Sequence, residues 1–201
     1  MKKIALALLL AATTFHASAT VLSNRSDWTA ATVVAKTLGF EGVAPANDYT
    51  YLGGAYGSNG VSFSNGQYFA ISSTYSGGQL TTGTGDALFE DSANGTAMSI
   101  NLGGAYSAFA IDLNGYTGTH NLTITLSDNE VFNLSLNNTT SFFGVVLDHT
   151  FSSLTINSTF YTSLDNLSVG AAKNAVPEPA SAALLGLGLL GLGLARRKSG
   201  K

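Results

Sequence analysis

The residues whose spacing most clearly serves a chemical step form the tetrad Val176-Pro177-Glu178-Pro179, near the C-terminus. Proline fixes its own φ angle, lacks a backbone N–H and pushes the preceding residue out of the helical region. Val176 and Glu178 are therefore expected to be extended, and a helix can begin only at about Pro179. An extended peptide of this kind suits an enzyme that cleaves or transfers the chain.

An uncharged and mostly apolar run, 180–195, follows the tetrad, and a basic cluster of Arg196, Arg197 and Lys198 comes after it. A helix of this length spans roughly 24 Å, which is short of the bilayer's hydrocarbon core of about 30 Å. Four glycines weaken the helix further. The pattern predicts a transmembrane helix at 180–195, a linker at 174–179 outside the membrane and a basic cytoplasmic tail at 196–201.

The order of these parts resembles the PEP-CTERM sorting signal of Gram-negative bacteria. The resemblance lies in Pro177-Glu178-Pro179, then the apolar segment, then Arg196-Arg197-Lys198, and it covers about an eighth of the chain. In that family the signal is recognised by exosortase, a membrane-embedded, cysteine transpeptidase-like enzyme. Its substrates are typically exported, processed near the tetrad and associated with exopolysaccharide, biofilm or floc. The resemblance implies that this chain is an exosortase substrate. The alternatives are an ordinary, lasting C-terminal membrane anchor and a bacterial relative of a tail-removal signal such as that for GPI anchors.

The N-terminus carries a second export signal. Two lysines precede an apolar run, and Ala17-Ser18-Ala19 fits the small-residue pattern of a cleavage site. Residues 1–19 are therefore predicted to be a secretory signal peptide, with cleavage between Ala19 and Thr20. The chain has no cysteine, which excludes the lipoprotein route. We expect export through the inner membrane, and a place at the cell surface or outside the cell after processing.

The body of the chain, 20–175, has the length of one domain. It holds three basic and eleven acidic residues, a net charge of −8. Such an acidic surface argues against nucleic acid as a partner. It also argues against lasting contact with anionic lipid headgroups, so the membrane is expected as a partner only before processing.

Catalytic constellations are not evident in this body. Only His120 and His149 remain after signal cleavage, and the sequence contains neither H-E-x-x-H nor G-x-S-x-G. Asp148 and His149 are neighbours in an expected strand, so their side chains should point to opposite faces. With isolated histidines and no cysteine, zinc is not expected either. The sequence therefore predicts a protein that is not an enzyme.

The elements that must carry any binding site are mostly strands. A short helix is expected at 26–31, with Ser26 as its N-cap. Leu122, Ile124 and Leu126 alternate with threonines, and Asp128-Asn129 predicts a hairpin to 131–136. Other strands are expected at 36–41, 61–64, 67–72, 87–90, 96–102, 106–113, 142–147, 154–157 and 164–169, with Gly-rich loops at 43–59 and 73–85. This pattern predicts a jelly-roll-like, antiparallel two-sheet sandwich over residues 20–173.

The body also resembles, more loosely, the ectodomains common in PEP-CTERM proteins. The resemblance lies in Leu38-Gly39-Phe40-Glu41-Gly42, Gly60-Val61-Ser62-Phe63 and Leu164-Asp165-Asn166-Leu167-Ser168-Val169. Many such domains look like carbohydrate-binding jelly rolls, in which an early acidic residue and one on the last strand often share a structural calcium ion. The resemblance implies Glu41 and Asp165 as calcium ligands. The alternative is that Glu41 caps a turn and that Asp165 and Asn166 bond to nearby backbone.

Tyrosines in and near the Gly-rich loops offer a platform for sugars: Tyr49, Tyr51, Tyr56, Tyr68 and Tyr75. The alternative is that these rings cover the open end of the sandwich. The sequence as a whole predicts an exported surface or matrix protein that exosortase sorts and that associates with exopolysaccharide or biofilm. The rival hypothesis is a secreted carbohydrate-binding module, for which the tail is only a delivery signal.

Overall fold

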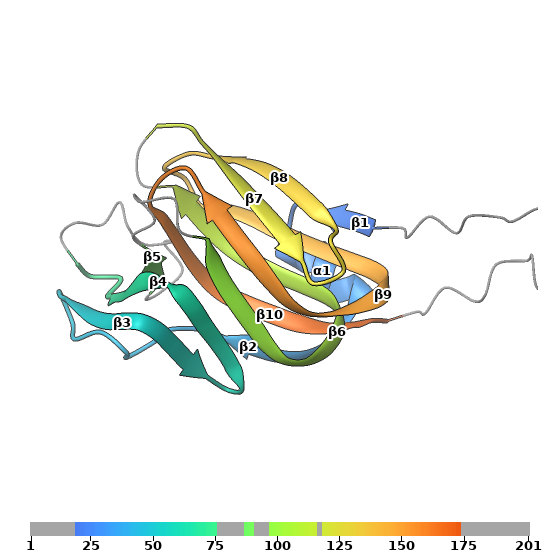
Figure 1. The fold of residues 1–201 in the computed structure, drawn as a ribbon, viewed down its shortest axis with the longest axis horizontal. Coiled ribbons are helices and arrows are strands. Elements are labelled where there is room, and N and C mark those ends of the chain that lie inside the picture. Colours follow the sequence, from blue (N-terminus) through green and yellow to red (C-terminus); the bar gives the residue numbers. More distant parts are fainter. Residues whose placement is uncertain (1–18, 76–86, 91–96, 116–117, 174–201) are drawn as a thin grey trace, which may run out of the picture.

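The computed structural model describes residues 19–75, 87–90, 97–115 and 118–173. Within these ranges the chain forms one helix and ten strands (Figure 1). They are β1 (Ala19–Leu22), α1 (Arg25–Ala31), β2 (Thr32–Leu38), β3 (Tyr49–Ser58), β4 (Val61–Ile71), β5 (Ala87–Glu90), β6 (Met98–Gly115), β7 (His120–Leu126), β8 (Val131–Leu136), β9 (Ser141–Ser158) and β10 (Thr162–Ala172).

All the strand pairings are antiparallel, and they connect the strands in the order β2-β10-β5-β4-β6-β9-β7-β8. In addition, β1 pairs with β9, β3 with β4, and β10 with β6. In Figure 1, β7 and β8 lie at the upper side and β3 and β4 at the lower side. The mainly antiparallel β prediction is confirmed. The described strands form one continuous sheet, so two separate sheets remain a prediction.

The long strands β6 and β9 account for this continuity. Each is 18 residues long, and they pair over two stretches, separated by a shift in register. One stretch joins Met98–Asn101 to 153–156, and the other joins Ala108–Leu113 to 141–146. The sequence predicted two short strands in place of each, because the glycines and polar residues at the register shift look like the end of a strand.

Alternating apolar residues fill the interior. Leu122, Ile124 and Leu126 of β7 are buried in a hydrophobic cluster to which strands from β2 to β10 contribute, as their period predicted. A smaller cluster lies under α1, where Trp28 packs against Ala108 and Ala110 and donates its Nε1 hydrogen to Val145 O at 3.2 Å. A buried ring therefore anchors the helix to the sheet.

The helix begins one residue earlier than predicted, and its N-cap is not Ser26. Asn24 is the N-cap: it has an extended backbone, and its Oδ1 accepts the backbone N–H of Asp27 at 2.8 Å. Ser26 lies inside the first turn and donates its hydroxyl to the same oxygen at 2.8 Å. The cap must stand three residues before the N–H that it accepts, and Asn24 has that position.

The Gly-rich segment 43–59 was predicted to be a loop, which is wrong for most of its length. Tyr49–Ser58 forms β3, which pairs with β4 across a two-residue turn of Asn59 and Gly60. Both turn residues have positive φ, 52° and 74°, as a type I′ hairpin requires. The Asn-Gly pair was the informative signal, and the glycines on either side of it obscured the strands.

The remaining predicted segments fall largely outside the described residues. These are the signal peptide up to residue 18, the linker 174–179, the transmembrane helix 180–195 and the basic tail 196–201. Within the described ranges α1 is the one helix, and its 7 residues are too few to cross a bilayer.

Candidate functional site

An aromatic surface on β3 and β4 is the most exposed apolar feature among the tyrosines that the sequence singled out. Tyr49 and Tyr51 are two residues apart in β3, so they lie on the same face of the strand, and they are 48% and 57% exposed. The Phe69 ring of β4 lies 5.8 Å from the ring centroid of Tyr49 and 5.0 Å from that of Tyr51. Tyr75 extends the group, with its ring 5.8 Å from that of Tyr49. We call these four residues the aromatic platform.

The other two predicted tyrosines do not belong to the platform. Tyr68 is fully buried and donates its hydroxyl to Ser64 O at 2.6 Å. Tyr56 packs against the core beside Phe40 and Phe63. The sequence missed Phe69, whose signal was its place opposite Tyr51 in the hairpin register. Among the described strands β3 pairs only with β4, so the platform lies on an edge strand, its partner and the residues just after that partner, and two of its four rings face solvent.

Polar residues flank the platform and fix the loop beside it. The hydroxyl of Thr74 accepts the backbone N–H of Asn47 at 3.0 Å and lies 2.9 Å from the hydroxyl of Ser72. Asp48 accepts the N–H of Tyr49 at 2.8 Å through its side chain. Flat apolar rings beside hydroxyl, amide and carboxylate groups can hold a ligand that has apolar faces and polar edges.

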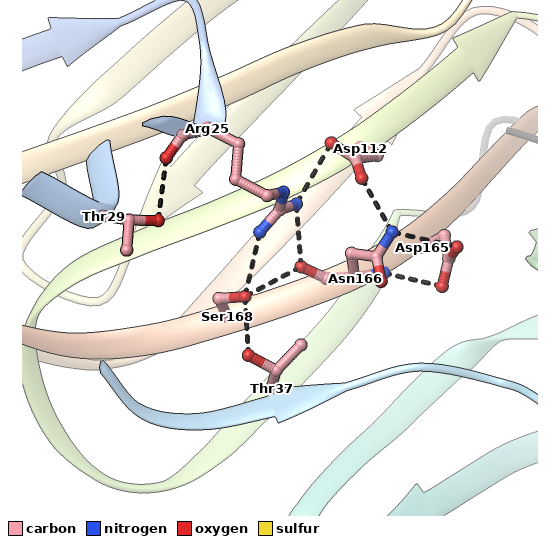
Figure 2. A network of polar contacts seen from close by, with 7 residues as sticks. All are labelled: Arg25, Thr29, Thr37, Asp112, Asp165, Asn166 and Ser168. Atoms are coloured by element: carbon pink, nitrogen blue, oxygen red, sulfur yellow. Dashed lines mark hydrogen bonds and ion pairs between the residues drawn. The ribbon is translucent and has the colours of Figure 1, made fainter. Parts of the chain in front are cut away.

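A second polar group surrounds Asp165, one of the two predicted calcium ligands (Figure 2). Asn166 donates its backbone N–H to Asp165 Oδ1 at 2.7 Å. The side-chain amide of Asn166 donates to Asp165 Oδ2 at 3.1 Å and to Asp112 Oδ2 at 2.8 Å. Arg25 forms an ion pair with Asp112 Oδ1 at 3.0 Å. Asp165 is fully buried and Asp112 nearly so. We call these four residues the arginine network.

Two features of the backbone position this network. The register of β10 against β6 shifts between Asp165 and Ser168, and Asn166 at this point has a positive φ of 51°. Arg25 comes from the start of α1, and its guanidinium also donates to Ser168 Oγ and Asn166 O, both at 3.1 Å. Asparagine tolerates the left-handed conformation better than most residues. Asn166 can therefore adopt this backbone conformation while its side chain joins the two aspartates.

The structure places the predicted calcium ligands differently. Asp165 is in the interior, as described above, whereas Glu41 is exposed, in the turn that follows β2. A Cβ atom added at Gly39 would lie 3.9 Å from Asp165 Oδ1, so the chain approaches Asp165 two residues before Glu41. The bond from the backbone N–H of Asn166 to Asp165 is of the kind that the alternative, non-metal interpretation expected, whereas the bonds from the Asn166 side chain were not expected. Calcium at Glu41 and Asp165 remains a prediction.

A third group corrects the interpretation of His149. Its Nδ1 lies 2.8 Å from Oδ1 of the neighbouring Asp148, so these two side chains do not point apart. Its Nε2 lies 2.6 Å from Oδ2 of Asp128, in the β7–β8 turn. Val146 of β9 pairs with Ala108 of β6, and the next pair is Phe151 with Tyr106. Between these two pairs β9 therefore has more residues than β6, which makes a bulge in β9. This bulge breaks the alternation of side chains on which the prediction relied.

The C-terminal tail matches a known sorting motif. Residues 175–198 match the sequence profile of the PEP-CTERM protein-sorting motif. The chain carries a PEP-CTERM sorting motif. The match includes the predicted tetrad, Val176, Pro177, Glu178 and Pro179, and ends at Lys198, the last of the predicted basic residues. All of these PEP-CTERM residues lie outside the described ranges, as does Ala17 of the predicted signal cleavage site, whereas Ala19 and Thr20 lie in β1.

Solved structures resemble the fold that precedes the PEP-CTERM motif. A mutant of CBM29-2, a family 29 carbohydrate-binding module, is 16% identical with a TM-score of 0.37, covering 65% of this chain and 98% of its own. The CBM22-1–GH10 modules of Clostridium thermocellum xylanase 10B, complexed with xylohexaose, are 9% identical with a TM-score of 0.38. The match covers 70% of this chain and 29% of that one.

The catalytic domain of a GH87 α-1,3-glucanase with tetrasaccharides is 12% identical with a TM-score of 0.40, covering 74% of this chain and 30% of its own. Among curated protein sequences, none matches the chain. All three TM-scores lie below 0.5, which leaves the function of the β-domain to be argued from its own residues.

Proposed function

We propose that this chain is an exported surface or matrix protein, not an enzyme, whose β-domain is released or transferred outside the membrane by an exosortase that acts near Val176–Pro179. The observation that carries the proposal is the PEP-CTERM motif at residues 175–198. In this proposal the apolar run 180–195 holds the chain in the membrane until processing, and the basic cluster keeps its end in the cytoplasm.

The ends of the folded body support processing at both termini. The first strand begins at Ala19, beside the predicted signal cleavage site, and Thr20 pairs with Val146. The last strand ends at Ala172, four residues before Val176. Cleavage at the two proposed positions would therefore remove at most one paired residue from the sheet, so the domain does not have to unfold for either step.

The intact mass of the protein recovered from its native host tests this proposal. We expect a mass that begins at Thr20 and ends near the Pro-Glu-Pro tetrad, with any surplus giving the mass of an attached group. A variant with alanine at Pro177 and Pro179 should accumulate with its tail, because the segment is no longer held extended. A wild-type mass that runs to Lys201 would instead establish a lasting anchor and overturn the proposal.

Binding of a polysaccharide is a second candidate function, and the aromatic platform favours it. Sugar rings have apolar faces that stack on aromatic rings, while their hydroxyls bond to polar groups such as Asp48 and Thr74. Tyr49 and Tyr51 are exposed on an edge strand, where no other described strand covers them. Large apolar rings left in solvent commonly mark a binding surface. This function suits both a matrix protein and a secreted carbohydrate-binding module.

Co-sedimentation of the protein with the host's own exopolysaccharide tests this candidate. We expect replacement of Tyr49 and Tyr51 by alanine to weaken binding about tenfold or more, since each ring is a central contact. The matched variant, with phenylalanine at both positions, keeps the stacking faces and should bind nearly as the wild type does. Equal binding by the alanine and wild-type proteins would exclude the platform while leaving the sorting proposal untouched.

A further inference from the structure

One group of titratable side chains has no part in the functions proposed above. It lies where the β7–β8 turn meets the bulge of β9, and it consists of Asp128, Glu130, Asp148 and His149. A ligand atom from each of Asp128, Glu130 and His149 lies within 4.8 Å of the others. We call these four residues the histidine cluster. It combines one imidazole with three carboxylates, a donor set that suits a divalent metal ion.

The turn fixes the carboxylate of Asp128 and the backbone of Glu130. Asp128 Oδ1 accepts the backbone N–H of Glu130 at 3.0 Å, which leaves Oδ2 directed at His149. Asn129 between them has a φ of 72°, and its N–H is bonded to Leu126 O at 2.9 Å. A tight turn with these bonds places Asp128 and Glu130 beside each other without help from any ligand.

The bulge of β9 is held against the same turn. Ser127 Oγ accepts the backbone N–H of Ser152 at 3.0 Å, and Ser127 donates its own N–H to Ser153 O at 3.0 Å. His149 lies just before this contact and is brought to the turn by it. The ligand atoms therefore come from two segments that the backbone already joins, so little order has to be gained when an ion binds.

The imidazole is oriented as metal-binding histidines are. Asp148 Oδ1 lies 2.8 Å from Nδ1, where it can accept the Nδ1 proton. The lone pair of Nε2 then faces Asp128 Oδ2 at 2.6 Å and Glu130 Oε2 at 3.6 Å. A carboxylate that accepts the second N–H of a histidine is the usual outer partner at metal sites, because it fixes the tautomer and strengthens the ligand.

Three acceptors that face one another require a cation between them. A proton on Nε2 satisfies Asp128 but leaves Glu130 Oε2 buried and without a hydrogen-bond partner. A metal ion bonds all three at once. A divalent ion at this point would bring two positive charges to the three ligand atoms, where the proton brings one.

The distances need only a small adjustment. Zinc binds imidazole nitrogen and carboxylate oxygen at about 2.0–2.2 Å, so neighbouring ligand atoms stand roughly 3 to 3.5 Å apart. The present separations from Nε2, 2.6 and 3.6 Å, lie just below and just above that range. A hollow of about 430 Å³, lined by Asp128, Asn129, Glu130 and His149, leaves room for water to complete the coordination shell.

We propose that the histidine cluster binds one divalent transition-metal ion of the zinc type through His149 Nε2, Asp128 and Glu130, with Asp148 orienting the imidazole. The nitrogen ligand favours zinc over calcium, which prefers an all-oxygen shell. The ion joins the β7–β8 hairpin to β9 and keeps an open position toward solvent. The site is separate from Glu41 and Asp165 and does not depend on the sorting proposal.

The test is a titration of the full-length protein, purified in detergent without a polyhistidine tag and stripped with EDTA, against zinc chloride alone. We expect one equivalent to bind with a Kd of about 10 μM or tighter and to raise the melting temperature. Glu130→Gln and His149→Gln should each weaken binding at least about tenfold, the loss expected for one ligand. Asp27→Asn, which removes an exposed carboxylate far from the cluster, is the matched control and should bind as the wild type does.

A second measurement keeps the result independent of folding. The circular dichroism of each variant, recorded without metal, should match that of the wild type, so a loss of binding cannot be a loss of structure. Cobalt in place of zinc should give a visible absorption band that disappears in His149→Gln. No saturable binding of zinc, or binding that survives both His149→Gln and Glu130→Gln, would overturn the proposal.

Discussion

The arginine network and the histidine cluster are both groups of carboxylates at a register shift of a long strand, and they are neutralised in opposite ways. In the network, Asp112 and Asp165 are buried, and their partners are the fixed charge of Arg25 and the amide of Asn166. In the cluster, the carboxylates are partly exposed, and the cation is an imidazole that can lose its proton.

Because of this difference, the arginine network should be insensitive to pH, whereas the histidine cluster should respond to pH and to metal ions. A guanidinium stays charged at any pH that a protein meets, and its planar fork holds several acceptors at once. An imidazole exchanges its proton near neutral pH, so another cation can take the proton's place. Arg25 therefore links α1 to β6 and β10 across the accessible pH range, whereas the contact between His149 and the carboxylates of the hairpin depends on a cation.

Removing the fixed cation should have the largest effect. Arg25→Ala leaves Asp112 buried without its ion pair and frees two further acceptors, so we expect a loss of about 2–4 kcal/mol in the free energy of unfolding. Urea denaturation of the metal-free protein measures it. Arg25→Lys keeps the charge but not the fork and should lose less. A loss below about 0.5 kcal/mol for the alanine variant would mean that the network is no more than a surface pair.

Removing the exchangeable cation should have a smaller effect that depends on pH. The hydrogen bond to Asp148 chiefly raises the pKa of His149, although burial lowers it. A raised pKa stabilises the fold below the unfolded value of about 6.5, and this stabilisation is lost as the pH rises through the folded value. In EDTA, His149→Gln should therefore cost about 0.5–1 kcal/mol near pH 5.5 and less near pH 8. A cost that grows with pH would contradict the proposed charge state.

Glu130→Gln should make the metal-free protein more stable. Burial raises the pKa of Glu130, so the ionised carboxylate destabilises the metal-free fold above that pKa. Glu130→Gln should then stabilise the EDTA-treated protein by roughly 0.5 kcal/mol near pH 7, and by little near pH 4. With zinc present the sign should reverse, because the wild type gains binding energy that the variant has lost. Thermal melts at both pH values, with and without zinc, measure both signs.

Salt should produce the smallest effect and should separate the two groups again. In about 0.5 M NaCl the Debye length falls to roughly 4 Å, which screens exposed charges more than buried ones. The cost of His149→Gln near pH 5.5 should therefore shrink to a few tenths of a kcal/mol, while the cost of Arg25→Ala should remain nearly unchanged. Equal screening of the two costs would show that both groups are equally open to water.

The sequence predicts those features of the protein that depend on neighbouring residues. The PEP-CTERM motif is a contiguous pattern, and the profile match confirms it. The hairpin of β7 and β8 follows from the alternation of Leu122, Ile124 and Leu126 and from the turn residues that come next. Asn59-Gly60 carried the same kind of signal, although the glycines around it led to the prediction of a loop.

The two carboxylate groups could not be predicted, because each depends on a bulge. Alternation along a strand places Asp148 and His149 on opposite faces, and only the extra residues of β9 bring them together. Arg25, Asp112 and Asn166 are far apart in the sequence and meet through long-range pairing of β10 with β6. A register shift is set by the packing of the whole sheet, which no local pattern records.

The pairing of the terminal strands bears on how the chain leaves the cell. Among the described strands, β1 pairs only with β9 and β2 only with β10, so the partners of the first two strands follow more than 100 residues later in the chain. Contacts at such sequence separation form slowly, because a long loop must close first. If the chain is exported as proposed, its leading segment can therefore remain unfolded during transport across the membrane. The sheet would close only after the strands from β9 onward have also crossed.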